Sequence, residues 1–262
     1  MAKLSKPQIK AHREACDLLQ KDRLTLDERE FVIRNWQESA THINSAAGAF
    51  FTPLDLAFDF AIEVNCDPPW SVIDLCSGIG ALSYAVFHRS TYGERQPRIV
   101  CVEKNPDYVA VGRKVLPEAE WICADVFELP DLGRFTFAIA NPPFGKGGPI
   151  KGVTLDLNVV AVAAKLAEFG AFILPQRSTP FRYSGRRSFE HATHSAYEAF
   201  HAKTGITLGP SCGIDCDFYK ADWRGVAPTV EIATAEFEAP VERPAFIPAQ
   251  ADLFATPETV TA

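Results

Sequence analysis

Short apolar runs alternate with amphipathic stretches through most of this chain of 262 residues. Strand and helix patterns follow one another with short connections, which predicts an α/β fold: a mainly parallel sheet with helices on both faces. The predicted strands are 70–75, 98–102, 121–123, 135–140, 171–174, 216–219 and 229–237. The predicted helices among them are 58–64, 80–87, 107–115, 158–168 and 188–202. The last two strands are expected to form an antiparallel hairpin at the edge of a sheet of about seven strands.

The two ends of the chain depart from this pattern. Residues 1–47 show helical periodicity, and Thr25 with Glu28 forms a capping box that predicts the start of a helix. Four prolines interrupt 240–262, which is predicted to be a disordered tail. The chain is therefore divided into an N-terminal helical segment, a main domain at 48–239 and a tail.

Composition indicates a cytoplasmic protein without a membrane anchor. The hydrophobic fraction of 47% is ordinary for a globular chain, and no run approaches the ~18 apolar residues of a membrane span. The N-terminus lacks the apolar core of a secretion signal. The seven cysteines are too scattered for a disulfide framework. His191, His194 and His201 have a spacing that allows a metal site, but surface histidines are the simpler interpretation, so no metal is expected.

The string Asn141-Pro142-Pro143-Phe144 ends the apolar run 135–140. Two prolines cannot donate ladder hydrogen bonds, so the strand stops there. Asn141 then lies at the carboxyl end of a strand, where open α/β sheets bind ligands. The Asn141 side-chain oxygen and the Pro142 carbonyl can each accept a hydrogen bond, and Phe144 offers a flat apolar face. These groups suit an amino group on a planar ring; a plain strand-ending turn is the alternative.

A second set of candidates follows the first three strands. The turn from Asp74 to Gly80 opens a helix, and its glycines allow the backbone to approach a ligand closely. Glu103 ends the second strand, where a carboxylate can bind both hydroxyls of a ribose. Asp125 ends the third, placed to accept from an adenine amino group. Position 83 is Ser83, not the third glycine of a pyrophosphate-binding turn, so a nucleoside without phosphates is predicted.

In this order the motifs resemble those of S-adenosylmethionine-dependent amino methyltransferases. The upstream string Phe50-Phe51-Thr52-Pro53 is similar to a segment of DNA adenine-N6 methyltransferases, including the modification subunits of type I restriction systems. The resemblance covers about residues 45–240. It implies a Rossmann-like class I methyltransferase fold with S-adenosylmethionine as cofactor. The cofactor-binding residues that it implies are Phe50, Thr52, Asp74, Gly78, Gly80, Glu103 and Asp125.

The resemblance also implies the reaction, a methyl transfer to the N6 amine of an adenine flipped out of DNA. Asn141 and the Pro142 carbonyl would hold the amine, and Phe144 would stack on the flipped base. Similar strings occur in enzymes that methylate guanine N2 in ribosomal RNA or a glutamine side chain in release factors. A non-catalytic module that docks on DNA or on a sliding clamp is the alternative from another class.

Basic residues follow the string directly. Between residues 145 and 187, seven basic residues face only Asp156 and Glu168, a local charge of +5 in a chain whose net charge is −7. A basic face beside an active site suits DNA as a polyanionic partner, and solvated loop charge is the alternative. The substrate-binding candidates are Pro143, Lys146, Lys151, Arg177, Arg182, Arg186 and Arg187.

The chain departs from the resembled family in how it could recognise a target DNA sequence. DNA adenine methyltransferases with this motif order usually carry a large target-recognition domain, but only about 95 residues separate Phe144 from the tail. The fold needs most of them. Recognition is therefore expected from the loop 145–157, the segment 176–190, the N-terminal helices or a partner.

The predicted tail contains the string Gln250-Ala251-Asp252-Leu253-Phe254. It resembles the sliding-clamp-binding peptides of bacterial replication and repair proteins. In those peptides a glutamine and a Leu-Phe pair fill a hydrophobic pocket, which assigns partner binding here to Gln250, Leu253 and Phe254. A tail that docks on its own domain is the alternative.

Overall fold

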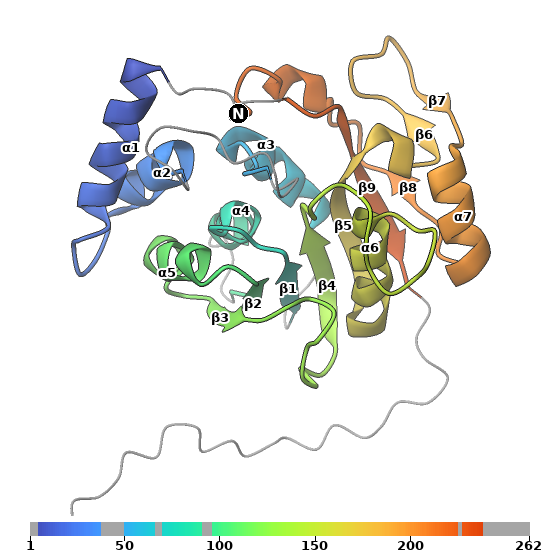
Figure 1. The fold of residues 1–262 in the computed structure, drawn as a ribbon, viewed down its shortest axis with the longest axis horizontal. Coiled ribbons are helices and arrows are strands. Elements are labelled where there is room, and N and C mark those ends of the chain that lie inside the picture. The colour runs from blue at the N-terminus through green and yellow to red at the C-terminus, as the bar shows by residue number, and fades with distance from the viewer. Residues whose placement is uncertain (1–4, 38–49, 66–69, 91–95, 225–226, 238–262) are drawn as a thin grey trace, which may run out of the picture.

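A twisted sheet of seven strands forms the centre of the computed structural model, which describes residues 5–37, 50–65, 70–90, 96–224 and 227–237 (Figure 1). The strand order is β3-β2-β1-β4-β5-β9-β8. The strands are β1 (Ser71–Leu75), β2 (Arg98–Glu103), β3 (Glu120–Cys123), β4 (Phe135–Ala140), β5 (Ala167–Pro175), β8 (Gly209–Pro210) and β9 (Val230–Glu236). The first five are parallel, and β9 runs antiparallel to both β5 and β8. This confirms the predicted fold class.

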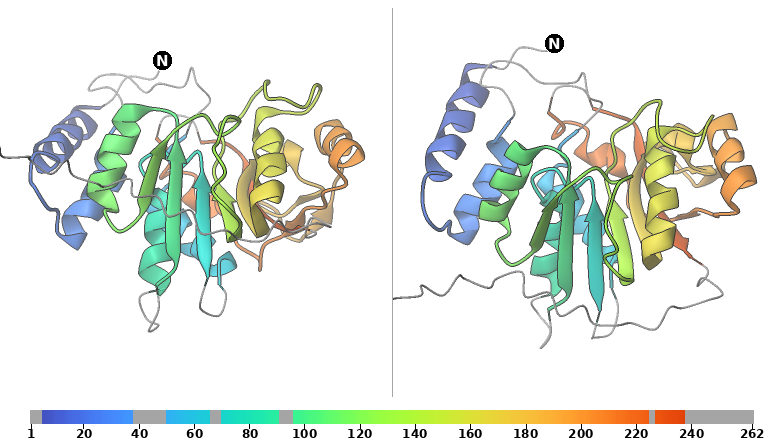
Figure 2. Two further views of the ribbon diagram at one scale, coloured as in Figure 1. Left: turned by 90° about the horizontal axis from the view of Figure 1, so that it is seen from below. Right: turned by 60° about the horizontal axis from the view of Figure 1, so that its bottom comes forward.

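Helices cover both faces of the sheet (Figure 2). One face carries α1 (Lys6–Leu18), α2 (Leu26–Asn35), α3 (Leu54–Phe60), the 3₁₀ turn η1 (Ala61–Glu63), α4 (Ala81–Ser90) and α5 (Pro106–Val115). The other carries α6 (Leu155–Leu166) and α7 (Ser195–Thr204). Neighbouring strand residues point to opposite faces, so Val72 joins the first core and Ile73 the second. Among the described residues, none of the helices combines the length and apolar character needed to cross a membrane.

The N-terminal helices begin at sequence-encoded caps. The predicted capping box of Thr25 and Glu28 is confirmed at the start of α2, and Ser5 with Gln8 forms a second one before α1. The α2 side chains Val32 and Ile33 are buried in the same core as α3, α4 and α5. The predicted tail, with Gln250, Leu253 and Phe254, lies outside the described residues, as does the whole segment 38–49 that precedes Phe50.

Two predicted elements are wrong. Residues 216–219 form a 3₁₀ turn, η3 (Cys216–Tyr219), because the Asp215 carboxylate accepts from the Asp217 N–H and turns the chain. The strand beside β9 is instead β8, so the expected terminal hairpin does not form. The predicted helix 188–202 begins only at Ser195. The residues before it form β7 (Glu190–His191), which pairs with β6 (Phe181–Arg182) after the short turn η2 (Gln176–Ser178).

Candidate functional site

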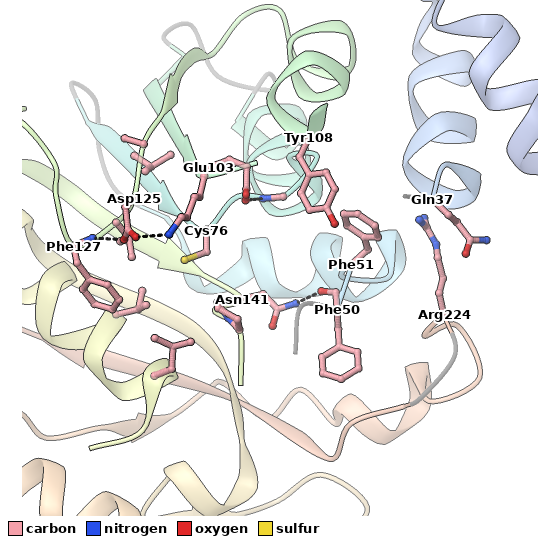
Figure 3. Close-up of a pocket in the computed structure, with 18 residues that line it drawn as sticks. Gln37, Phe50, Phe51, Cys76, Glu103, Tyr108, Asp125, Phe127, Asn141 and Arg224 are labelled. Carbon is pink, nitrogen blue, oxygen red and sulfur yellow. Dashed lines mark hydrogen bonds and ion pairs between the residues drawn. The ribbon is translucent and has the colours of Figure 1, made fainter. Parts of the chain in front are cut away.

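A cavity of about 270 Å³ opens at the carboxyl edge of the sheet (Figure 3). From β1 the chain crosses to β2 on one side, and β4 pairs with β1 on the other. Strand order therefore reverses at β1, and open α/β sheets bind ligands at such a reversal. The cavity brings together six of the predicted site residues: Phe50, Gly78, Glu103, Asp125, Asn141 and Pro143. Thr52 and Asp74 line a smaller adjoining cavity of about 30 Å³.

The carboxamide of Asn141 is held in one orientation. Its Nδ2 donates to the carbonyl of Phe50 and to Oγ1 of Thr52, each at 2.9 Å. The Phe50 carbonyl can only accept, so the amide nitrogen must face it. This leaves Oδ1 buried and without a hydrogen-bond partner among the described residues, although Asn141 lines both cavities. An unpaired buried acceptor is costly in isolation, so it marks a place for a donor from a ligand.

Three aromatic rings from distant segments meet beside Asn141. The rings of Phe50 and Phe144 lie 5.6 Å apart, and Trp223 meets Phe50 edge to face at 6.3 Å. Phe50 lines the cavity, while Phe144 is half-buried outside its lining. Phe144 therefore supports one side of the Phe50 ring in this structure. Pro142 is buried and also lies outside the lining.

The glycine turn is tied to the end of β2. Glu103 accepts from the Gly78 N–H through Oε2 and from the Asn105 N–H through Oε1, both at 2.8 Å. Gly78 has a φ of 58° and lines the cavity. Gly80, by contrast, lines neither cavity: its φ is 90°, and a Cβ there would lie 3.0 Å from the Trp121 ring. The positive φ and the nearby Trp121 ring explain why glycine is needed at this position.

The Asp74 side chain is almost wholly buried behind this turn. Its Oδ2 accepts from the Ser83 hydroxyl at 2.7 Å, and its Oδ1 has no hydrogen-bond partner among the described residues. Burial raises the pKa of Asp74 to about 7, against the opposing effect of the Ser83 hydrogen bond. Burial likewise raises the pKa of Glu103, against the N–H groups of Asn105 and Gly78. Two such carboxyls favour a ligand that is cationic or rich in hydrogen-bond donors.

The raised pKa of Asp74 predicts a pH dependence of folding. Its ordinary value is 3.8, so above pH 4 the unfolded state releases a proton that the folded state keeps up to about pH 7. The free energy of unfolding therefore falls as the pH rises through this window. We expect Asp74→Asn to reduce that fall by about 1–3 kcal/mol between pH 5 and 8. Urea unfolding of the ligand-free protein measures it; parallel pH profiles for the two proteins would contradict the assignment. Asp17→Asn, at an exposed position on α1, is the control.

Asp125 closes the far end of the cavity. Its Oδ1 accepts from the Phe127 N–H at 3.0 Å, and its Oδ2 pairs with Lys104 at 2.8 Å. The Lys104 hydrogen bond lowers the pKa of Asp125, which is therefore ionised at neutral pH. The Lys104 side chain is 76% exposed, so solvent screens the pair and its contribution to stability is small. A ligand amino group can replace Lys104 there at little cost.

Sequence reasoning missed several residues of the cavity wall. These are Gln37, Cys76, Lys104, Tyr108, Phe127 and Arg224. Arg224 donates to the carbonyls of Ile33 and Trp36 at the end of α2 and lies 5.4 Å over the Phe51 ring. These carbonyls are 191 and 188 residues earlier in the chain, so no local sequence pattern predicts the contact. Cys76 has a φ of 64°, a signal of a special position that only the backbone reveals.

The predicted basic residues lie on two surface segments beyond β4 and β5. Lys146, Lys151, Arg177, Arg186 and Arg187 are exposed. Arg182 is half-buried and contacts Nε2 of His194 at 2.6 Å. Within the described part of the chain, no carboxylate lies within 4.0 Å of any of these six cations. None of these six charges is therefore neutralised by a direct ion pair with a described residue.

Asn158 on α6 holds the loop 145–154, which carries Lys146 and Lys151. Its Nδ2 donates to the carbonyls of Gly147, Val153 and Thr154 at 2.9 to 3.1 Å. Its Oδ1 accepts from the Ile150 N–H at 2.8 Å. The loop 145–154 is thus fixed from within by one fully buried side chain.

Glu231 on β9 holds the segment 176–187, which carries the other four predicted basic residues. Its buried carboxylate accepts from the Gln176 side chain, from the N–H groups of Tyr183 and Ser184, and from the Ser184 hydroxyl. These distances range from 2.7 to 3.1 Å. Among the described residues no cation pairs with Glu231, so hydrogen bonds alone compensate its burial.

Comparison with known proteins identifies the fold. No protein-family model and no curated protein sequence matches the chain. A protein assigned to the class I S-adenosylmethionine-dependent methyltransferases, from Listeria monocytogenes, superposes with a TM-score of 0.58 at 10% identity, over 87% of this chain and 73% of its own. A modification subunit assigned to a type I restriction enzyme of Vibrio vulnificus gives 0.51 at 12% identity, over 82% of this chain and 50% of its own. The chain has the Rossmann-like fold of class I methyltransferases.

Proposed function

We propose that this protein transfers a methyl group from S-adenosylmethionine to the exocyclic N6 amine of an adenine in DNA. The observation that carries the proposal is the Asn141 carboxamide. Its Nδ2 is committed to Phe50 and Thr52, its Oδ1 is buried without a partner among the described residues, and Asn141 lines the cavity. An amine that donates a proton to this oxygen would satisfy it.

The cavity suits the proposed cofactor. Its volume of about 270 Å³ lies near the lower end of the ~300–1,000 Å³ typical of small-molecule sites. Glu103 uses one acceptor position per oxygen on Gly78 and Asn105, which leaves positions for the two hydroxyls of a ribose. Asp74 lines the adjoining cavity, and its Oδ1, which has no partner among the described residues, suits an ammonium group. Asp125 would accept from the adenine amino group.

The residues of this chain would act mainly by positioning. When bound, S-adenosylmethionine supplies an electrophilic methyl group on a sulfonium. Asn141 Oδ1 and the Pro142 carbonyl would accept the two N–H groups of the target amine, which frees its lone pair from the ring. Phe50, backed by Phe144, would present an apolar face to the base. Such orientation supplies much of the rate acceleration in a reaction that needs no strong base.

DNA is preferred over the other acceptors for two reasons. The Phe50–Thr52 segment marks the resemblance to DNA adenine methyltransferases, and it accepts two hydrogen bonds from the Asn141 side chain. The exposed cations at Lys146, Lys151 and Arg177 rise beyond the same sheet edge as the cavity and suit a phosphate backbone. The similarity in fold to a type I modification subunit agrees with this choice. Guanine N2 in RNA and a glutamine side chain are the alternative acceptors.

One transfer assay tests the proposal. The full chain is incubated with tritiated S-adenosylmethionine and, in parallel, with duplex DNA, ribosomal RNA or a protein extract. We expect label in DNA, recovered as N6-methyladenine after enzymatic digestion. Label confined to RNA or protein would replace the proposed acceptor, and no label in any arm would favour a non-catalytic module.

A contact with a sliding clamp through Gln250, Leu253 and Phe254 remains a separate proposal. It rests on the sequence resemblance alone, because these residues lie outside the described part of the chain. Such a tether would raise the local concentration of the protein at replicated DNA. A clamp pull-down that succeeds equally well without residues 249–262 would refute it.

A further inference from the structure

We infer that the ribbon β6–β7 and its connection 183–189 form a DNA-binding surface of this protein, with Phe189 stacking on a base and Arg186 and Arg187 binding phosphates. The inference rests on the proposed function, because it names the surface through which the same site engages DNA. It places a DNA-binding element within the fold itself.

The ribbon rises from the same edge of the sheet as the candidate active site. β5 pairs in parallel with β4, and Phe172 lies opposite Ala140, the residue before Asn141. β5 continues to Pro175, so the segment that follows it begins beyond the level of Asn141. Figure 1 shows β6 and β7 beyond the end of β5, beside α7.

The base of the ribbon is rigid. Phe181 pairs with His191 and Arg182 with Glu190, and the Ala192 N–H donates to the carbonyl of Pro180 at 3.1 Å. The Glu231 carboxylate holds the start of the connection. The Gly185 N–H donates to Oδ1 of Asp215 at 2.9 Å, which adds a second anchor. A connection held at both ends can present its side chains in a fixed geometry.

The chemistry of the connection matches nucleic acid. Phe189 is 39% exposed, and its ring stacks on buried Phe181 at 5.7 Å with an angle of 23° between the ring planes. One ring face is thus supported by the protein. Arg186 and Arg187 are exposed close by in sequence; Glu190 is the only acidic residue within 183–191, and Asp215 contacts the connection at Gly185. Aromatic rings that stack on bases, combined with cations that contact phosphates, are the usual means of binding a nucleic acid strand.

A second exposed phenylalanine shows why exposure alone does not identify a ring that stacks on DNA. Phe218 on η3 is 83% exposed, more than Phe189. It lies beside Asp217, whose carboxylate pairs with Lys220 at 3.1 Å, so no unpaired cation adjoins Phe218 in the described sequence around it. The combination of an exposed ring with a basic neighbourhood distinguishes Phe189.

The test measures the Kd of the full chain for a fluorescent duplex and for the matching single strand over a range of salt concentrations. We expect Phe189→Ala to weaken binding about tenfold, the loss of one stacked base, without changing the salt slope. We expect R186A/R187A to weaken binding and to reduce the slope of log K against log salt by about 1.4–1.8. Phe189→Trp should retain binding, because its ring can still stack.

Two matched controls separate the ribbon from general effects. Phe218→Ala removes a more exposed ring. R89A/K165A removes an equal number of positive charges from the last turns of α4 and α6, at the opposite edge of the sheet. Both should keep the wild-type Kd within about twofold. The inference is overturned if F189A and R186A/R187A also keep it, or if the controls lose as much. Methyl transfer by the wild type is scored separately, so the proposed function can fail while the ribbon still binds DNA.

Discussion

Replacing Asn141 with alanine is expected to lower the rate of methyl transfer at least a hundredfold while leaving the affinity for S-adenosylmethionine within about threefold. Among the described residues that line the cavity, Asn141 alone carries a buried side-chain acceptor without a partner. The substitution removes this Oδ1 together with the Nδ2 that donates to Phe50 and Thr52. Cofactor binding is assigned instead to Glu103, Asp74 and Asp125. A tritiated-methyl assay at saturating DNA measures the rate, and calorimetric titration measures cofactor affinity.

The control for this prediction is Asn35→Ala. The Asn35 carboxamide also donates to a backbone carbonyl, that of Phe31, but it does not line the cavity. Its removal should leave transfer within about twofold of wild type. Turnover within tenfold of wild type in Asn141→Ala would sink the proposed role. Loss of cofactor affinity with a matching loss of turnover would move Asn141 to the cofactor side of the site.

Replacing Glu231 with glutamine is expected to lower the free energy of unfolding by about 2–4 kcal/mol. The carboxylate accepts from Gln176, Tyr183 and Ser184, and glutamine puts an NH₂ group against some of these donors. Burial at 1% exposure prevents water from replacing the lost bonds. Thermal unfolding should show a lower Tm, and amide exchange should accelerate at 176–191.

The isosteric change Glu236→Gln provides the comparison. Glu236 lies on the same strand, β9, but at its exposed end. Its substitution should change stability by no more than about 0.5 kcal/mol. Equal, small effects at both positions would show that the Glu231 hydrogen bonds do not order the segment. A fall in stability without faster exchange at 176–191 would place the effect elsewhere in the core.

Sequence patterns predicted the parts of the fold that depend on local chemistry. β4 matches its prediction at both ends, because an apolar run stops at two prolines that cannot continue a ladder. The capping box of Thr25 and Glu28 likewise fixed the start of α2. The stretch 216–219 failed because its aromatic residues suggested a strand, while an Asp215 side chain bends the backbone into a 3₁₀ turn.

The candidate site was predictable where its residues lie at the carboxyl ends of parallel strands. Glu103, Asp125 and Asn141 end consecutive parallel strands of the pattern, so topology alone brings them together. Arg224 and Trp223 were not predictable, because they reach the site from a turn whose position depends on the whole sheet. The same holds for Glu231, a charged residue in an apolar strand, whose partners lie 47 to 55 residues away.

The Asn158 side chain has a consequence for how quickly and how tightly this edge of the protein can engage a partner. Because Asn158 fixes the loop 145–154 through four hydrogen bonds, the conformational entropy of that loop is lost when the chain folds. It need not be lost again on association, where ordering a free loop would cost about 1–2 kcal/mol per residue. In the proposed complex with DNA, Lys146 and Lys151 would therefore lie on a preorganised loop, and association at this edge should resemble rigid-body docking more than folding upon binding.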